Sequence, residues 1–185
     1  MRKTILGVGD SLVYGLPEPL FAPDRLINAG VPGDETTDVI RRLKAQRLPC
    51  CGDVFILVGI NDLLRDMNAM IARRDDETVN NIITIASKLK AFSASGRLLI
   101  VGLLPVSAHT KYVKEDAVEA TNARINAFNA LLKAHAMAQG FTMIDVFPSF
   151  LDGGRLHPRF TTDGIHLTEE GKERLAHRIT EVLSR

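Results

Sequence analysis

Short runs of apolar residues alternate along the chain with longer stretches in which apolar residues recur every three or four positions. The short runs predict buried strands, and their nearly continuous apolar character favours parallel strands covered on both faces. They comprise residues 3–8, 26–29, 53–58, 97–103 and 142–146. The longer stretches predict amphipathic helices. These comprise a helix from Thr36 or Thr37, residues 78–94, residues 118–138 and a last helix that opens at Thr168.

A strand followed by a helix, repeated about five times, is typical of a doubly wound α/β domain. The chain has 185 residues, of which 45% are hydrophobic and 24% charged, and we expect it to form one domain over residues 1–185. Two connections, at about 62–77 and 105–117, are longer than a tight turn requires. Both leave the carboxyl ends of predicted strands, where open α/β sheets bind ligands.

Composition and charge narrow the class of partner. The formal net charge of +1 gives no electrostatic reason to expect nucleic acid or an anionic membrane as a partner. The two cysteines, Cys50 and Cys51, are adjacent, which fits neither a disulfide framework nor a zinc site. No apolar run approaches a membrane span, and the stretch after Lys3 reaches Asp10 too soon for a signal-peptide core. We therefore expect a cytoplasmic protein with two reduced thiols, while a vicinal disulfide between them remains open.

Glycine and polar residues follow the first three predicted strands and precede the last helix. These segments are residues 9–11 (GDS), 28–34 (NAGVPGD), 59–62 (GIND) and 163–166 (DGIH). Because the carboxyl ends of parallel strands lie along one edge of a sheet, the first three segments can line one cleft. Each segment alone has a simpler explanation as a turn or a helix cap. Their agreement at one edge predicts a functional site there.

The residue types in these segments suit nucleophilic catalysis. Ser11 can act as a nucleophile once a base takes its proton, and neutral His166 is suited to that task near pH 7. Asp163 lies three residues before His166, a spacing that can bring the two side chains together. Its carboxylate would then fix the tautomer of the imidazole and stabilise the imidazolium.

A tetrahedral intermediate also needs hydrogen-bond donors for its oxyanion. The candidates are the backbone N–H groups of Ser11 and Gly33 and the side-chain amide of Asn61. Gly33 has no Cβ, which lets the backbone approach a substrate closely. The sequence therefore contains each group that acyl transfer through a serine requires.

At these four segments the sequence resembles the SGNH, or GDSL-type, hydrolases, an acyl-esterase family named for residues in separate blocks. The blocks read GDSL at 9–12, NAGVPGDET at 28–36, GIND at 59–62 and DGIH at 163–166, and LTEEG follows the last. In the second block two glycines compete for the oxyanion role, and the N-x-G-x-x-G pattern favours Gly33 over Gly30. The resemblance spans almost the whole chain, and it is specific because four spaced motifs agree.

The resemblance implies a flavodoxin-like, three-layer α/β/α fold with a parallel sheet of about five strands, and neither a metal nor another cofactor. It implies that Ser11 is the nucleophile and that His166 acts as base and then as acid, oriented by Asp163. Gly33 and Asn61 are implied at the oxyanion.

The implied function is that of a serine esterase, an acylhydrolase that cleaves carboxylic esters or thioesters through an acyl-enzyme on Ser11. Asp10 is expected to order the turn and not to serve as the acid of the triad. Lysophospholipids, acyl-CoA thioesters and acetylated sugars all remain open as small-molecule substrates. We expect a short-to-medium acyl group, since a chain of this size has no room for a substantial lid domain.

A non-catalytic α/β domain that binds phosphate or a nucleotide is the alternative from a different class. Gly7 and Gly9 after the first strand are compatible with it, but Leu12 stands where the third glycine of a G-x-G-x-x-G motif belongs. An α/β-hydrolase also carries Ser, Asp and His in this order, but the sequence has no G-x-S-x-G motif.

Overall fold

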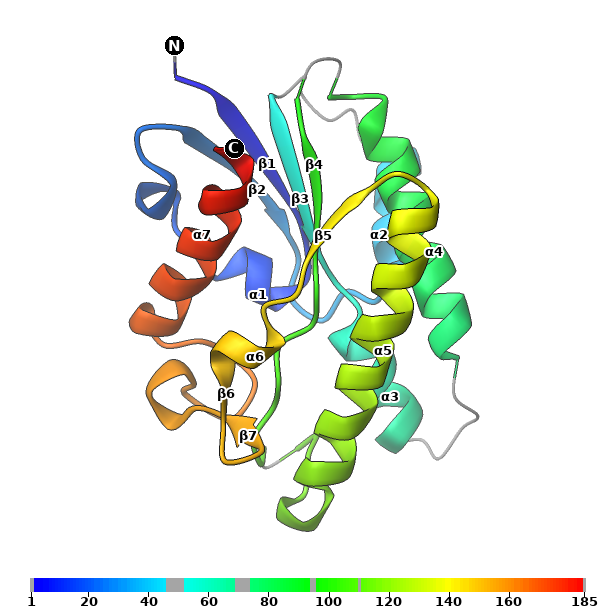
Figure 1. Cartoon of the computed structure of the whole chain (residues 1–185), viewed down its shortest axis with the longest axis vertical. Helices are drawn as coiled ribbons and strands as arrows, with labels where there is room; N and C mark the ends of the chain where they lie inside the picture. The colour runs from blue at the N-terminus through cyan, green and yellow to red at the C-terminus, as the bar shows by residue number, and fades with distance from the viewer. Residues whose placement is uncertain (1, 46–51, 69–73, 94–95, 110, 185) are drawn as a thin grey trace.

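The computed structural model describes residues 2–45, 52–68, 74–93, 96–109 and 111–184 (Figure 1). The predicted thiols of Cys50 and Cys51 lie outside these residues. A five-stranded sheet occupies the centre, with the strand order β2-β1-β3-β4-β5. Its strands are β1 (Thr4–Gly9), β2 (Arg25–Gly30), β3 (Asp53–Leu57), β4 (Leu98–Val101) and β5 (Thr142–Ile144). All four pairings are parallel, which confirms the predicted parallel sheet.

The chain reverses direction across the sheet beside β1. It runs from β1 to β2 on one side and then returns to β3 on the other, so β1 pairs with both neighbours. Leu6 of β1, for example, faces Ile27 of β2 and Val54 of β3. The carboxyl ends of β1 and β3 therefore meet at the topological switch point, where doubly wound sheets bind their ligands.

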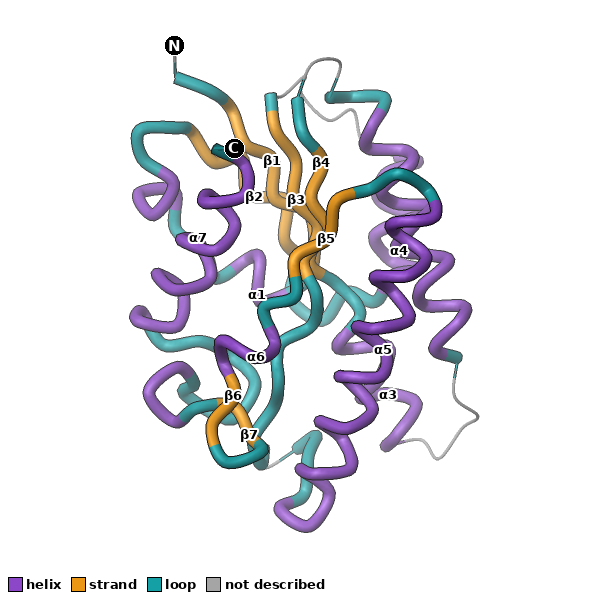
Figure 2. Tube along the Cα trace, in the orientation of Figure 1, coloured by secondary structure: helices purple, strands orange, loops and turns teal. Residues whose placement is uncertain are grey.

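Helices cover both faces of the sheet, as Figure 2 shows. One layer holds α2 (Thr36–Ala45), α4 (Asp75–Lys90) and α5 (Val118–Ala138), and the other holds α7 (Glu169–Leu183). The shorter helices are α1 (Ser11–Tyr14), α3 (Ile60–Asn68) and α6 (Phe147–Phe150), with 3-10 turns at η1 (Glu18–Phe21), η2 (Glu115–Ala117) and η3 (Pro158–Phe160). The three-layer α/β/α architecture and the flavodoxin-like strand order are confirmed. In the part of the chain that the structure describes, every helix is too short or too polar to cross a membrane.

The last helix illustrates how the sequence sets an element boundary. Thr168 is the N-cap of α7, and its hydroxyl accepts a hydrogen bond from the N–H of Gly171 at 3.1 Å. Glu169 and Glu170 follow in the first turn, where the helix dipole favours negative charge. Leu175, Ile179 and Leu183 are fully buried beneath the helix. The predicted start of this helix is confirmed.

The structure adds elements that the apolar pattern does not predict. Helix α3 lies in the segment expected to be a long connection after the third strand. It spans little more than two turns and begins directly after Gly59, whose φ of 125° turns the chain out of the sheet. A hairpin of β6 (Leu151–Asp152) and β7 (Arg155–Leu156) also forms before the last helix. Elements this short carry too few apolar positions to show a period.

Candidate active site

The structure brings Ser11, His166 and Asp163 together at the carboxyl edge of the sheet. Ser11 is the first residue of α1, separated from the end of β1 only by Asp10, and its Oγ lies 3.1 Å from His166 Nε2. His166 Nδ1 lies 2.7 Å from Asp163 Oδ2. With Nδ1 donating to the carboxylate, Nε2 is the nitrogen that can accept the serine proton. The line from carboxylate through imidazole to hydroxyl is the arrangement that the sequence predicts.

The turn before α7 fixes the carboxylate of Asp163. Its Oδ1 accepts hydrogen bonds from the backbone N–H groups of Ile165 at 2.9 Å and His166 at 2.8 Å. Partial burial raises the pKa of Asp163, but the hydrogen bonds from His166 and Ile165 outweigh it and lower that pKa to about 2. Asp163 is therefore a carboxylate at neutral pH and can stabilise a positive charge on His166.

Gly164 lets this turn sit tightly against the loop that follows β4. Its φ is 99°, and a Cβ at this position would collide with the carbonyl oxygen of Ala108. The N–H of Ser107 donates to the Gly164 carbonyl at 2.8 Å. Only glycine combines this φ with this approach, so the loop after β4 becomes the support on which Asp163 and His166 rest.

Asp10 orders the turn that presents Ser11, as the sequence predicts. It is the N-cap of α1, fully buried, and its Oδ1 accepts from the N–H of Leu12 at 2.9 Å. Among the described residues no group bonds its Oδ2. Burial is the main cause that raises the pKa of Asp10 to about 7, and the nearby carboxylates of Asp62 and Asp34 add to it.

The three expected oxyanion donors are open to a ligand. Within the described structure the backbone N–H groups of Ser11 and Gly33 donate no hydrogen bond. Ser11 is the first residue of a helix, where N–H groups have no partner within the helix. Asn61 lies in the first turn of α3 and uses one side-chain N–H to bond the carbonyl oxygen of Asp34 at 2.9 Å. Among the described residues, its second amide N–H has no hydrogen-bond partner.

The two glycines that compete for the oxyanion role have different surroundings in the structure. The N–H of Gly30 is already bonded to Asn28 Oδ1 at 2.9 Å, and a Cβ there would collide with the backbone of Tyr14. A Cβ at Gly33 meets no atom within 4 Å, but its φ is 82°. The close approach of one backbone segment to another therefore occurs at Gly30, whereas the expected close approach of a substrate to Gly33 stays a prediction. Gly33 is needed for its left-handed backbone.

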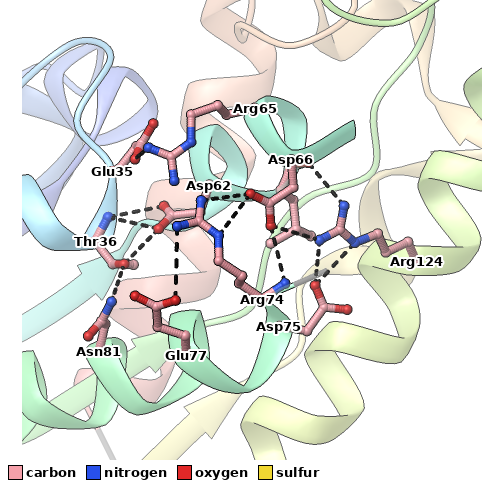
Figure 3. Close-up of polar contacts among 11 residues, drawn as sticks. Glu35, Thr36, Asp62, Arg65, Asp66, Arg74, Asp75, Glu77, Asn81 and Arg124 are labelled. Carbon is pink, nitrogen blue, oxygen red and sulfur yellow. Dashed lines mark hydrogen bonds and ion pairs between the residues drawn. The ribbon is translucent and has the colours of Figure 1, made fainter. Parts of the chain in front are cut away.

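A network of polar and charged side chains supports α3 and the loop after β2 (Figure 3). Asp62 is the residue that follows Asn61, and both the N–H and the Oγ1 of Thr36 donate hydrogen bonds to its carboxylate, at 3.0 and 2.7 Å. Desolvation by burial raises the pKa of Asp62, although the hydrogen bonds from Thr36 oppose it. An ion pair joins Glu35 of this loop to Arg65 of α3.

The far end of α3 is held by Arg124, which comes from α5 and is buried (Figure 3). Its guanidinium donates to Asp75 at 2.6 Å, to the carbonyl oxygen of Leu63 at 3.1 Å and to Asp66 at 3.4 Å. Arg74 pairs with Asp66 from the other side at 2.8 Å. Helix α3 is thus tied at both ends, and Asn61 is fixed with it.

Sequence reasoning gave no separate role to Asn28 or Arg42, and both hold the site in place. Asn28 Nδ2 donates to the carbonyl oxygens of Val13 at 2.7 Å and Leu16 at 2.9 Å, which closes the end of α1. Arg42 Nε donates to Asp34 Oδ2 at 2.7 Å and so anchors the turn that carries Gly33. Asn28 is the first residue of the second motif, at 28–36, so its place in that motif could have indicated a role. No feature of the sequence indicated a role for Arg42.

Two pockets open at these residues. One, of about 300 Å³, is lined by Ser11, Leu12, Tyr14, Gly15, Pro32, His166, Leu167 and Lys172. The other, of about 520 Å³, is lined by Gly33, Glu35, Asn61, Leu64, Arg65, Lys111 and Tyr112. Ser11 and His166 therefore line one pocket, and Gly33 and Asn61 line the other. Each of the chain's two tyrosines lines one of them, Tyr14 the first and Tyr112 the second.

No group of three or more His, Cys, Asp and Glu within the described ranges is placed to hold a metal ion.

The family of the chain follows from comparisons with known proteins. The model of the GDSL-like lipase/acylhydrolase family matches residues 8–174. The rat (Rattus norvegicus) platelet-activating factor acetylhydrolase IB subunit alpha2 is 26% identical over 188 residues, covering 97% of this chain and 75% of the relative.

Two solved structures are similar in fold. A GDSL-like lipase from Bacteroides thetaiotaomicron superposes with a TM-score of 0.80 at 22% identity, covering 98% of this chain and 88% of that one. An acetyl xylan esterase superposes with a TM-score of 0.79 at 18% identity, covering 97% and 99%. At these identities the two structures support the fold alone. The family model, in contrast, matches most of the chain, and the matched residues include all four motifs. The chain therefore belongs to the GDSL-like lipase/acylhydrolase family, and it is an ester-cleaving hydrolase.

Proposed function

We propose that the chain is a serine esterase that cleaves carboxylic ester or thioester bonds through an acyl-enzyme on Ser11. One observation carries the proposal: His166 lies within hydrogen-bond distance of both Ser11 Oγ and Asp163 Oδ2, through different ring nitrogens. This is the geometry in which an imidazole can take a proton from a hydroxyl while a carboxylate stabilises the resulting charge.

In the first half-reaction His166 Nε2 takes the proton of Ser11 as Oγ attacks the carbonyl carbon of the ester. The carbonyl oxygen becomes an oxyanion that accepts hydrogen bonds from the N–H groups of Ser11 and Gly33 and from Asn61 Nδ2. When the intermediate collapses, the bond to the leaving oxygen or sulfur breaks and His166 Nε2–H protonates it. An acyl ester on Ser11 and a free alcohol or thiol result.

In the second half-reaction a water molecule takes the place of the alcohol. His166 removes a proton from this water, whose oxygen attacks the acyl carbon, and the same donors hold the second oxyanion. The bond to Ser11 Oγ then breaks, His166 returns the proton to Oγ, and a carboxylic acid leaves. Asp163 keeps its charge throughout and holds Nδ1–H.

Short acyl esters, with acetyl esters first among them, are the substrate class that we propose. The relative with 26% identity is named an acetylhydrolase, which supports an acetyl group as the starting point. A lysophospholipase, a thioesterase or a carbohydrate acetylesterase would use the same site. A series of p-nitrophenyl esters from acetate to palmitate tests this, since a clear preference for long acyl chains would contradict it.

The alternative of a non-catalytic phosphate or nucleotide binder does not fit a chain of this family. The glycines that suggested it serve the packing of the sheet. A Cβ at Gly7 would strike the ring of Phe55, and a Cβ at Gly9 would fall on the carbonyl oxygen of Leu57. These glycines are therefore needed where β1 and β3 meet.

Hydrolysis of p-nitrophenyl acetate by the wild type and by Ser11→Ala tests the mechanism. We expect the variant to lose activity by about 10⁴ or more, with an unchanged circular dichroism spectrum. Ser87→Ala is the matched control and should retain full activity, because the one partner of the Ser87 hydroxyl among the described residues is the carbonyl of Ile83 in its own helix. A fluorophosphonate probe should add its mass to the peptide that contains Ser11. An active Ser11→Ala variant would show that another group is the nucleophile.

A further inference from the structure

A second histidine lies beside the carboxylate of Asp163. His109 Nε2 is 3.7 Å from Asp163 Oδ2, the same oxygen that bonds His166. The His109 side chain is only 12% exposed, whereas that of Asp163 is 37% exposed. In the part of the chain that the structure describes, no lysine or arginine pairs with Asp163. Its Oδ2 therefore lies between two imidazole rings.

The loop after β4 fixes which nitrogen of His109 carries the proton. His109 Nδ1 accepts hydrogen bonds from the backbone N–H groups of Lys111 at 3.0 Å and Tyr112 at 3.3 Å. Accepting two donors requires the lone pair of Nδ1, so the proton of the neutral ring resides on Nε2. That N–H is the one closer to Asp163.

The orientation of the His109 ring is also fixed. The backbones of His109 and Val113 bond each other in both directions, at 2.8 and 3.2 Å, which closes a narrow turn. The ring stacks on Tyr112 with 4.8 Å between centroids. The neighbouring residue Ala108 packs on Gly164, inside the turn that holds Asp163 and His166. The ring has little freedom to turn its Nε2 away from the carboxylate.

We propose that His109 is a positioning residue for Asp163: its Nε2–H donates to Oδ2 during turnover and holds the carboxylate in line with His166. This proposal rests on the proposed esterase function. Hydrogen bonds at catalytic sites are often long in the free enzyme and shorten in the substrate complex. His109 keeps its proton throughout, so no proton transfer is added to the mechanism. Two backbone N–H groups already donate to Asp163 Oδ1, whereas among the described residues Oδ2 has only His166 as a donor at hydrogen-bond distance. Asp163 Oδ2 is therefore the oxygen that can accept from a second donor.

Two substitutions separate this role from a structural one. His109→Asn places an amide oxygen near the position of Nδ1, so it keeps the acceptor for the turn and loses the donor to Asp163. His109→Gln places an amide N–H near the position of Nε2, so it keeps the donor and loses the acceptor. We expect His109→Asn to lower kcat about tenfold, the value of one charge-assisted hydrogen bond, with KM and Tm unchanged. We expect His109→Gln to retain most of kcat with a lower Tm.

The opposite pattern would overturn the proposal. If His109→Asn has the kcat of the wild type, His109 only caps its own turn. If both variants lose kcat in proportion to a loss of Tm, the residue is structural. His177→Asn is the control, since His177 is an exposed residue of α7.

A readout that needs no substrate keeps this test separate from that of the esterase function. The proton between His166 Nδ1 and Asp163 Oδ2 should give a low-field NMR signal in the free protein. We expect this signal to move or broaden in His109→Asn and to stay in place in His177→Asn. An unchanged signal in His109→Asn would overturn the proposal, even if p-nitrophenyl acetate proves not to be a substrate. Failure of the esterase function would instead appear as an inactive wild type with the signal still sensitive to His109.

Discussion

Asn61 Nδ2 donates a hydrogen bond to the carbonyl oxygen of Asp34, 2.9 Å away, in the residue that follows Gly33. This bond joins the start of α3 to the turn after β2, so it fixes the two proposed oxyanion donors, Asn61 and Gly33, relative to each other. Electrostatic stabilisation by such donors is strongest when they are in place before the reaction begins. The same amide thus organises the site and can contribute a hydrogen bond to the oxyanion.

Asn61→Ala should fold normally and lower kcat by roughly 10²–10³, as removal of one oxyanion donor does in other hydrolases. Steady-state hydrolysis of p-nitrophenyl acetate measures the effect. Asn81→Ala is the matched control: Asn81 also donates from Nδ2, to Thr36 Oγ1 at 3.0 Å, but it lies on α4 within the supporting network. If the two variants lose kcat equally, Asn61 acts through the network and not as a donor.

Gly33→Ala and Gly30→Ala should fail in different ways. At Gly33, where φ is 82° and space is open, alanine costs about 1–2 kcal/mol of backbone strain. The relaxed turn moves the N–H, so we expect kcat to fall at least about tenfold while the protein remains folded. At Gly30 the new Cβ meets the backbone of Tyr14, so we expect a large loss of Tm. A stable, fully active Gly33→Ala variant would remove this N–H from the oxyanion site.

Arg124→Met should destabilise the protein by about 3 kcal/mol, because it leaves the buried carboxylate of Asp66 with one cation in place of two. Urea unfolding measures the free energy. Arg155→Met is the control, since Arg155 pairs with Glu115 at an exposed site, where such a pair contributes about 0–1 kcal/mol. Equal losses in both variants would show that the network does not hold α3.

Asp10 should make stability depend on pH. Its pKa is about 7 in the folded protein and near its ordinary value of 3.8 when unfolded. Between these values the folded state binds more protons than the unfolded state, so stability falls as pH rises from about 4 to about 7 and then levels off. Asp10→Asn keeps the acceptor for Leu12 and removes this titration. The Tm of Asp10→Asn relative to the wild type should therefore increase across that range.

Thermal unfolding at several pH values checks this, with Asp116→Asn as the control. Asp116 is exposed, so its substitution removes a similar charge without affecting a buried group. We expect the difference between Asp10→Asn and the wild type to reach on the order of 5 °C above pH 7. A difference that does not change with pH would show that Asp10 keeps the same protonation state on folding.

Much of the fold follows from local pattern. Nearly continuous apolar runs identified all five strands, and the amphipathic stretch at 118–138 coincides with α5 (Val118–Ala138). The apolar pattern did not predict helix α3, because this helix is short and rich in charged residues. Its apolar residues Leu63 and Leu64 are buried, but two turns of helix do not make a readable period. Such an element depends on tertiary contacts, here those of Asp62 and Asp66.

The sequence by itself determined the candidate site, since four motifs at strand ends and before the last helix name Ser11, Gly33, Asn61, Asp163 and His166. It could do so because strand order and parallel pairing bring those ends to one edge. Only the tertiary structure decided how the residues act on one another. It showed that the N–H of Gly30 is already bonded while that of Gly33 is open. It also placed His109 against Asp163, which no spacing along the chain could indicate, because that contact joins two loops that meet only when the sheet is assembled.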